Sequence, residues 1–474
     1  MSHPEREHDS PTGQLAGFAS TLEYPSIPDA TIAHAKLSVL DTLGCALYGE
    51  SLPWTAMVRD FVLSEGGDPQ ATLWGSLFRV ARTQAALVNA AAAHSFEFDD
   101  IHMGGMIHPG ALALGAALAA GEGRPVDGRR LLTAFAAGCE VGARVGMSVG
   151  TAHFRAGYHP QGTVGVFAAS AAAGRVMNLD TLAMRNAIGI AGTQAAGLMA
   201  AQEGSMAKRL HSGLACQAGV RSALLASRGF TGIADVLEAD FGGFCSTMGG
   251  GQVDMAALTS GLGSKWETDE IGFKPYAACA AAQSSIEVAR QVREEAHLSG
   301  ADVQSVTIHA STHAQMHSGW EYRPNGATAA QMSIPYCVAS MLLHGDVSAD
   351  RFTEAATNDP DVIDLARRVN VIGDQRIDAL GPAQRYTVRV ELRTNDDRIL
   401  TGEATDRPGG PTRPLSPQTI RDKFDELVSP ILGERGAHRV RELVDRLETL
   451  NDVSDLIAAT VPVARHRSTE ASNT

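Results

Sequence analysis

The sequence predicts a mainly α-helical protein into which a smaller α+β region is inserted. Aromatic residues make up only 5% of the 474 residues, whereas glycine occurs 49 times. Small side chains let helices pack closely, and a large β-sandwich would need more aromatic and β-branched residues. Apolar residues recur at a helical period over most of the chain, and alternation of apolar and polar residues is confined to a shorter stretch in the second half.

The longest part of the chain, residues 24–261, has a helical pattern. Within residues 32–47, apolar side chains recur at the spacing of one buried helix face. Short connections marked by glycine, proline or aspartate separate such segments, as is typical of packed helices. The other helices predicted in this part are 84–94, 131–149, 165–176, 178–193 and 213–228, the last ended by Gly229.

The pattern changes near residue 268. Residues 303–312 and 386–392 alternate apolar and polar side chains, which indicates strands. A turn at residues 395–397 leads into residues 399–403, so the second strand is predicted to form a β-hairpin. Helices are predicted between and after these strands, at 281–296, 332–343, 419–432 and 437–447.

We therefore expect a helical domain over residues 14–267, an α+β domain over 268–404 and a return to the helical domain over 405–460. Residues 1–13 and 463–474 are polar and are predicted to be disordered. A cleft between two domains is a natural place for a substrate.

Composition and charge exclude several classes of protein. The formal net charge is −14, and no basic run is interleaved with aromatic residues, so we expect no nucleic-acid partner. No apolar stretch is long enough to span a bilayer, and the N-terminus lacks the apolar core of a signal peptide. We expect no membrane association and a cytoplasmic location, or a mitochondrial one in a eukaryote. Six scattered cysteines predict neither a disulfide framework nor a zinc site.

Motifs for common cofactors are missing from the sequence. It contains no G-x-G-x-x-G after a strand, no Walker A loop and no H-E-x-x-H. Several polar clusters within apolar helical stretches remain. An acidic protein that binds an anionic substrate must concentrate its cations in one pocket, so these clusters are the candidates for a site.

The first cluster follows a helix that should be buried. Buried carboxylates are costly unless they are paired, and crowding shifts their pKa values toward the range useful for proton transfer. Alternatively, Asp99 and Asp100 cap and brace helix ends. His102 and His108 could ligate a metal, but no third ligand stands at a telling spacing. The members of the cluster are His94, Glu97, Asp99, Asp100, His102 and His108.

Two further clusters contain histidines and cations. His159, between Tyr158 and Pro160, is a candidate general acid or base, because imidazole titrates near neutrality; a packed loop histidine is the alternative. Lys208, Arg209 and His211 precede a predicted helix start, where backbone N–H groups also favour an anion. These side chains predict a carboxylate clamp, with a solvated basic turn as the alternative.

The last two clusters carry less weight by themselves. A packed or surface polar stretch is an equally good interpretation of each. One cluster runs from Lys274 through Tyr276 and Cys279 to Gln283. The other contains His313, His317, Trp320, Glu321, Tyr322 and Arg323.

Together, in this order and spacing, the clusters resemble the MmgE/PrpD family, which includes 2-methylcitrate dehydratase, cis-aconitate decarboxylase and iminodisuccinate epimerase. The resemblance extends from Leu40 to about Leu450. The stretches that carry it are Phe96-Glu-Phe-Asp-Asp100, Gly157-Tyr-His-Pro160, Lys208-Arg-Leu-His-Ser-Gly213, Gly229-Phe-Thr-Gly232, Lys274-Pro-Tyr276 and Gln331-Met-Ser-Ile-Pro-Tyr336. Stretches most similar to the fungal decarboxylases are Leu52-Pro-Trp54, residues 193–202, Gly242-Gly-Phe244 and Ala330-Gln-Met-Ser333.

The resemblance implies a helical domain built from both chain ends, a smaller lid domain and a homodimer that uses neither a metal nor an organic cofactor. It also implies a small polycarboxylate substrate. The candidate catalytic residues are His108, His159, Lys208, Glu97 and Tyr322. The candidate substrate-binding residues are Asp100, Arg209, His211, Lys274 and Gln283.

The sequence departs from the family pattern at two positions. Ile101 stands where animal decarboxylases have threonine, and Gln283 stands where a lid histidine is expected. Since glutamine cannot shuttle a proton, either another residue does so or the reaction differs. We expect a lyase that decarboxylates a cis-aconitate-like substrate. Dehydration of an alkylcitrate, epimerisation of an iminodisuccinate-type substrate and an inactive binding homologue are the alternatives.

Overall fold

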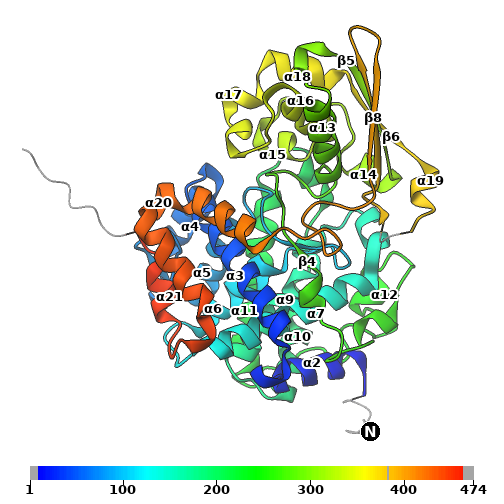
Figure 1. Ribbon diagram of the computed structural model, residues 1–474. Coiled ribbons are helices and arrows are strands. Elements are labelled where there is room, and N and C mark those ends of the chain that lie inside the picture. The colour runs from blue at the N-terminus through cyan, green and yellow to red at the C-terminus, as the bar shows by residue number, and fades with distance from the viewer. Residues whose placement is uncertain (1–8, 382–383, 463–474) are drawn as a thin grey trace, which may run out of the picture.

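The computed structural model describes residues 9–381 and 384–462, and the fold is mainly α-helical, as predicted. Figure 1 shows two parts, which we call the helical region (α2–α12 with α20 and α21) and the sheet region (α13–α19 with β5–β8). The domain boundaries near residues 268 and 404 stay predictions. None of the described helices is both long and apolar enough to cross a membrane.

The centre of the helical region is α6 (Pro109–Gly121), in which every residue is buried. Small residues allow this close packing. A Cβ added at Gly138 in α7 (Gly128–Arg155) would lie 2.9 Å from the backbone oxygen of Ala168 in α9 (Gly165–Val176). The helices packed around this centre include α2 (Pro11–Thr21), α3 (Asp29–Glu50), α4 (Pro53–Glu65), α5 (Arg82–Ala93), α10 (Thr181–Gly192) and α11 (Ala207–Ala226).

The two ends of the described chain meet in the helical region. The long C-terminal helix α20 (Pro417–Asp445) packs against α3, and α21 (Ser454–Ala459) packs against α20. Figure 1 shows these helices, in orange and red, beside the blue helices near the N-terminus. The chain bends within α20 at Gly433, where φ is 74°, which explains why the sequence pattern predicts two helices there.

The sheet region is built on a four-stranded sheet in the order β6-β5-β7-β8. The predicted hairpin is present as antiparallel β7 (Val388–Thr394) and β8 (Ile399–Ala404). The sequence analysis missed β6 (Val369–Gly373), which pairs in parallel with β5 (Val303–Ala310). The longest helices of this region are α13 (Gln283–Glu295) and α16 (Ile334–His344), which pack against each other.

Most predicted helix starts differ from the observed ones by two or three residues, and two differ more. Helix α2 begins at Pro11, inside the stretch 1–13 predicted to be disordered, because the Ser10 side chain caps its first turn by accepting from the Gly13 N–H. Residues 1–8 and 463–474 of the predicted tails lie outside the described residues. Helix α11 begins at Ala207 rather than at residue 213. Lys208 and Arg209 therefore lie in its first turn, where a cation is unfavourable unless an anion offsets it.

Candidate active site

The first cluster of the sequence forms a buried turn between α5 and α6. Within it, Glu97 has φ 54°, a left-handed conformation that residues other than glycine seldom adopt. The turn continues into the short strand β3 (Ile101–His102), which pairs with β4 (Ile271–Gly272) just before the sheet region. This pairing brings Lys274 to the turn, where its Nζ lies 3.1 Å from the backbone oxygen of Glu97.

The carboxylate of Glu97 is surrounded by three cations. Lys208 Nζ donates to its Oε1, Arg209 Nη1 lies 2.6 Å from the same oxygen, and Lys274 Nζ lies 3.3 Å from Oε2. All four residues are buried. The neighbouring cations hold the pKa of Glu97 well below its ordinary value although burial acts in the opposite direction, so Glu97 is ionised.

These contacts change the interpretation of the predicted clamp. The cations of Lys208 and Arg209 already have a protein carboxylate between them, and Arg209 also donates to Gln331 Oε1 at 2.8 Å. Lys208 lines the cavity described below, whereas Arg209 does not. With Lys274 and with Asp99, whose pKa is also held well below its ordinary value, the cluster has three cations against two carboxylates. One positive charge therefore remains for an anionic ligand.

Asp99 holds two histidines beside this cluster. Its Oδ2 lies 2.8 Å from His94 Nδ1 and 3.1 Å from His108 Nδ1. Burial lowers the pKa of His94 to about 3, so His94 is neutral and its Nδ1–H donates to Asp99. Two imidazoles and a carboxylate within 4.8 Å of one another could also hold a divalent metal ion. Of the two histidines predicted as possible metal ligands, only His108 belongs to this group, because His102 lies 3.2 Å from Glu267 instead.

His159 forms a second imidazole pair. Its Nδ1 lies 2.8 Å from Nδ1 of His211, so one ring donates and the other accepts. Burial and the nearby Lys208 ammonium lower the pKa of His159 well below its ordinary value, and burial lowers that of His211 to about 4. Both rings are therefore neutral at pH 7. The direction of the shared proton decides whether His159 Nε2 accepts or donates a proton toward the cavity.

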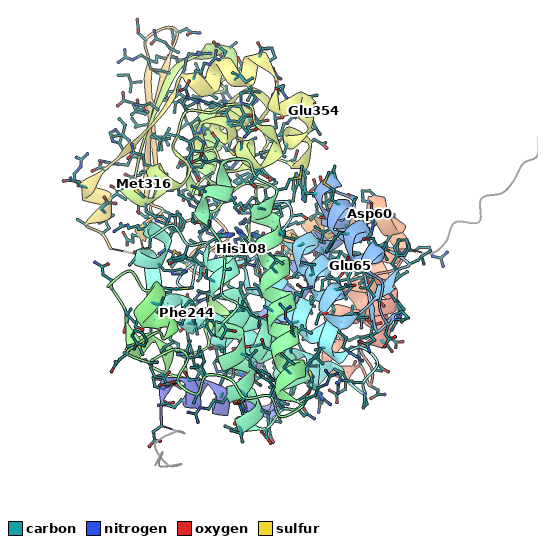
Figure 2. All side chains as sticks on the ribbon, turned by 180° about the vertical axis from the view of Figure 1, so that it is seen from behind. Asp60, Glu65, His108, Phe244, Met316 and Glu354 are labelled. Atoms are coloured by element: carbon teal, nitrogen blue, oxygen red, sulfur yellow. The ribbon has the colours of Figure 1, made fainter. Side chains whose placement is uncertain are left out.

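A small cavity of about 50 Å³ joins these groups to the sheet region. Figure 2 shows His108 at the level where the helical and sheet regions meet. His313 and His317 of α14 (Thr312–Ser318) reach the cavity from the sheet region, together with Tyr386 before β7. The other polar lining residues are Glu97, His108, His159, Lys208 and Cys279.

His313 and His317 belong to the last polar cluster of the sequence, for which a packed or surface stretch was an equally good interpretation. Burial lowers their pKa values to about 2 and about 4, and neither Nδ1 has a hydrogen-bond partner among the described residues. They supply imidazoles from the sheet region, where the resemblance led us to expect a histidine at position 283. Tyr386 was not singled out, because the strand pattern around it does not distinguish a cavity-facing tyrosine from a packed one.

Six predicted site residues lie outside the cavity lining. Arg209 and Lys274 contact the lining residue Glu97, and His211 contacts the lining residue His159, whereas the other three are held by different contacts. Asp100 accepts hydrogen bonds from Ser38 and from the Gly110 N–H at the start of α6, as in the helix-bracing alternative, and burial raises its pKa to about 8. Gln283 donates to the backbone oxygens of Tyr276 and Ala278 and so holds the turn before α13. The remaining residue is Tyr322, whose hydroxyl donates to the Thr357 backbone oxygen at 2.8 Å.

Two residues that sequence reasoning missed position the site. Gln161 accepts from the His108 N–H at 2.8 Å and donates to Ser212 at 2.9 Å. Lys423 of α20 forms a buried ion pair with Asp41 at 2.6 Å and donates to the backbone oxygen of Phe98. Each is joined to its partners across more than fifty positions of sequence, so no local pattern could have indicated them.

Fold and site together define a mainly helical protein with a buried, histidine-rich cavity beside a cluster of three cations and two carboxylates. The chain belongs to the MmgE/PrpD family: the MmgE/PrpD N-terminal domain matches residues 13–256, and the MmgE/PrpD C-terminal domain matches residues 276–449.

Individual relatives match nearly the whole chain. A cis-aconitate decarboxylase of Aspergillus terreus is 31% identical over 94% of this chain and 95% of its own length. A cis-aconitate decarboxylase-like protein of Aspergillus oryzae is 29% identical over 94% of this chain and 96% of its own length. The cis-aconitate decarboxylase of Homo sapiens is 27% identical over 94% of this chain and 93% of its own length.

Proposed function

We propose that the protein is a lyase that decarboxylates cis-aconitate or a close tricarboxylate analogue, with His108, His159 and His317 as the proton-transfer groups and Lys208 as the cation that binds substrate. The observation that carries the proposal is the cavity itself, in which four imidazoles meet a cluster with one excess positive charge. The similarity to decarboxylases along almost the whole chain supports it.

The proposed reaction needs one proton and a place for negative charge. When the carbon–carbon bond to the departing carboxylate breaks, its electron pair remains on the substrate as a delocalised carbanion. A proton then adds at carbon, and carbon dioxide leaves. Lys208 stabilises the charge that develops on the remaining carboxylates, because a fixed cation acts strongly in a site that excludes water.

The lowered histidine pKa values fit this scheme. In the free protein, His159 is neutral because it is buried beside Lys208. A bound trianion adds negative charge next to the ring, which favours the protonated form and raises the pKa of His159. Substrate binding thereby favours protonation of His159, and this proton is later transferred to the carbanion. His108, fixed by Asp99, and His317 are the other imidazoles placed to deliver it.

Substrate binding requires the cavity to widen. The cavity volume of about 50 Å³ has room for only a few water molecules and is too small for a tricarboxylate. Four methionines line the cavity, and such flexible side chains repack easily. They also offer an apolar wall for an alkyl group, which favours alkylcitrate dehydration as the second candidate function. These methionines are Met103, Met106, Met199 and Met332.

Proton NMR in deuterated buffer tests the proposal. The purified protein is incubated separately with cis-aconitate, 2-methylcitrate and iminodisuccinate. We expect itaconate from cis-aconitate, with one carbon-bound deuterium because the added proton comes from solvent. An alkene from 2-methylcitrate would instead identify a dehydratase, and exchange of a carbon-bound proton in iminodisuccinate alone would identify an epimerase. Thermal stabilisation by all three compounds without turnover would identify a binding homologue.

The homodimer that the family resemblance implies belongs to the same proposal. Sedimentation of the full chain at concentrations bracketing those of the NMR experiment measures it directly. A single species with the mass of one chain would contradict this part.

A further inference from the structure

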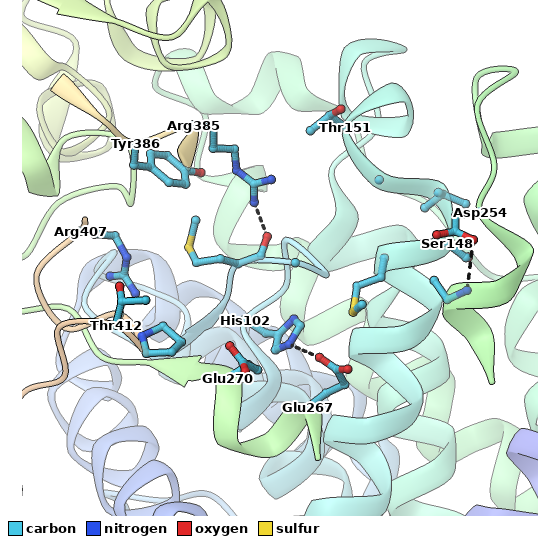
Figure 3. Close-up of a pocket in the computed structure, with 18 of the residues that line it drawn as sticks. His102, Ser148, Thr151, Asp254, Glu267, Glu270, Arg385, Tyr386, Arg407 and Thr412 are labelled. Carbon is cyan, nitrogen blue, oxygen red and sulfur yellow. Dashed lines mark hydrogen bonds and ion pairs between the residues drawn. The ribbon is translucent and has the colours of Figure 1, made fainter. Parts of the chain in front are cut away.

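A second, larger cavity of about 630 Å³ lies at the seam between the helical and sheet regions. It shares Met103 and Tyr386 with the candidate active site, so the two cavities are neighbours separated by these side chains. Figure 3 shows Arg385, Tyr386, Arg407 and Thr412 along one side of this cavity.

Arg407 is a buried cation without a compensating charge. Arg407 comes shortly after β8 in the sequence, and it is only 5% exposed. Among the described residues neither Nε nor Nη1 has a hydrogen-bond partner, and Nη2 reaches only the backbone oxygen of Gly409 at 3.5 Å. No described carboxylate forms an ion pair with it. Burial lowers its pKa to about 10, so the guanidinium still keeps its charge at neutral pH.

Arg385 lies on the same side of the cavity and is 8% exposed. Its Nη2 donates to the backbone oxygen of Met103, and its guanidinium lies 5.3 Å from the centre of the Tyr386 ring. Its Nε has no hydrogen-bond partner in the part of the chain that the structure describes. It too forms no ion pair with a described carboxylate. Two guanidinium groups therefore face one cavity with unused donors.

The carboxylates of the cavity do not neutralise these arginines. Glu267 is engaged by His102 at 3.2 Å and by Lys265 at 3.1 Å, and these partners help lower its pKa to about 2. Asp254 accepts from the Ala256 N–H at 3.0 Å. Glu270 and Asp406 also line the cavity, but both are partly exposed and neither pairs with a described arginine.

A buried charge is costly unless an anion accompanies it. We propose that Arg385 and Arg407 form a binding site for a carboxylate group of a small organic acid, separate from the catalytic cavity. The planar fork of a guanidinium matches a carboxylate, and the hydroxyls of Tyr386 and Thr412 lie on the same side as further donors. An acid bound here touches Met103 and Tyr386, which also line the catalytic cavity, and so lies beside the path by which that cavity widens.

Isothermal titration with tricarballylate, a saturated tricarboxylate with no double bond to assist decarboxylation, tests this site. We expect two equivalents per chain for the wild type. Arg407→Met should weaken one of them by at least about tenfold, because it removes charge-assisted hydrogen bonds, and should leave the other unchanged. Lys208→Met should show the converse. Arg398→Met is the matched control, because Arg398 is an exposed arginine on the β7–β8 hairpin that pairs with Asp396.

Two results would overturn the proposal. One is a single equivalent in the wild type that Lys208→Met abolishes and Arg407→Met leaves intact. The other is that Arg407→Met weakens self-association in sedimentation while both equivalents persist, since a carboxylate of a second copy would then occupy the arginines. Far-ultraviolet circular dichroism of each variant confirms that the compared proteins are folded. Loss of turnover in the NMR experiment leaves this binding test unaffected.

Discussion

The Glu97 cluster and the arginine cavity both lie between the helical and sheet regions, but they differ in how their positive charges are compensated. Lys208, Arg209 and Lys274 surround one protein carboxylate, whereas no described carboxylate forms an ion pair with Arg385 or Arg407. The first arrangement is largely self-compensated and holds the active-site turn in place. The second leaves its charge to an external anion. A buried cation is therefore not by itself a ligand site. Whether it binds a ligand depends on whether a carboxylate of the protein already pairs with it.

This difference has a consequence for substrate binding. A substrate carboxylate that approaches Lys208 competes with Glu97, so it gains from the one excess charge of the cluster and not from three free cations. In the arginine cavity a ligand competes with water and with the backbone oxygens of Met103 and Gly409. Replacing residues of each region should separate these two behaviours.

The largest expected effect is that of His159→Gln. Removing a general acid–base group lowers turnover by about a hundred- to ten-thousand-fold, and the fold should be retained because glutamine can still hydrogen-bond to His211. Steady-state itaconate formation measures the loss. His153→Gln is the matched control, since His153 is a buried histidine that binds Thr163 and lines neither cavity. Turnover by His159→Gln at the level of the His153 variant would rule out the proposed role.

The next largest effect is on stability. Glu97→Gln leaves three buried cations without their carboxylate and should lower the free energy of unfolding by about 3–5 kcal/mol. Urea unfolding measures this change. Glu442→Gln is the control, because its partners Arg439 and Arg446 are about half exposed and each such surface pair contributes only about 0–1 kcal/mol.

In the arginine cavity we expect a substitution to raise the free energy of unfolding instead of lowering it. Without ligand, Arg407→Met should raise the free energy of unfolding by about 1–2 kcal/mol, since it removes an uncompensated buried charge while keeping the side-chain volume. If Glu97→Gln and Arg407→Met change stability in the same direction, the contrast between the two regions is wrong.

A smaller effect follows from the buried histidines. His94 and His313 have pKa values of about 3 and about 2 in the folded protein, against 6.5 when unfolded. Below pH 6.5 the unfolded chain therefore binds more protons, and stability falls as the pH falls, by up to about 1.4 kcal/mol per pH unit for each group. Asp100, with a raised pKa, acts in the opposite direction and partly offsets this slope. Urea unfolding of wild type and His313→Gln between pH 7 and about pH 5 should show a flatter curve for the variant; parallel curves would contradict the assignment.

The smallest effect distinguishes two tyrosines. Tyr322→Phe loses one hydrogen bond to a backbone oxygen, so it should cost about 1 kcal/mol of stability and change turnover less than about twofold. Tyr386→Phe removes a hydroxyl from the cavity lining and should lower turnover by about tenfold. The reverse order of effects on kcat would mean that Tyr322 moves into the cavity when substrate binds.

Much of the fold could be predicted because helical and strand periods are local properties. The alternation of side chains predicts the β7–β8 hairpin, and the structure contains this hairpin. Strand β6 was missed because its five residues are flanked by polar residues in the sequence. The start of α11 was misplaced, since a Lys-Arg pair in a first turn is locally unfavourable. Glu97, more than a hundred residues away, compensates for it.

The sequence by itself determined the family, the mainly helical fold and the segments that carry the ionisable groups, because these depend on composition, period and ordered motifs. Only the tertiary structure decided which groups act together. Packing of distant segments placed Glu97 between three cations, brought His317 to the cavity from which Gln283 is absent, and left Arg407 without a carboxylate partner among residues 9–381 and 384–462. Charge compensation and burial depend on distances between side chains far apart in the chain, and no local pattern contains those distances.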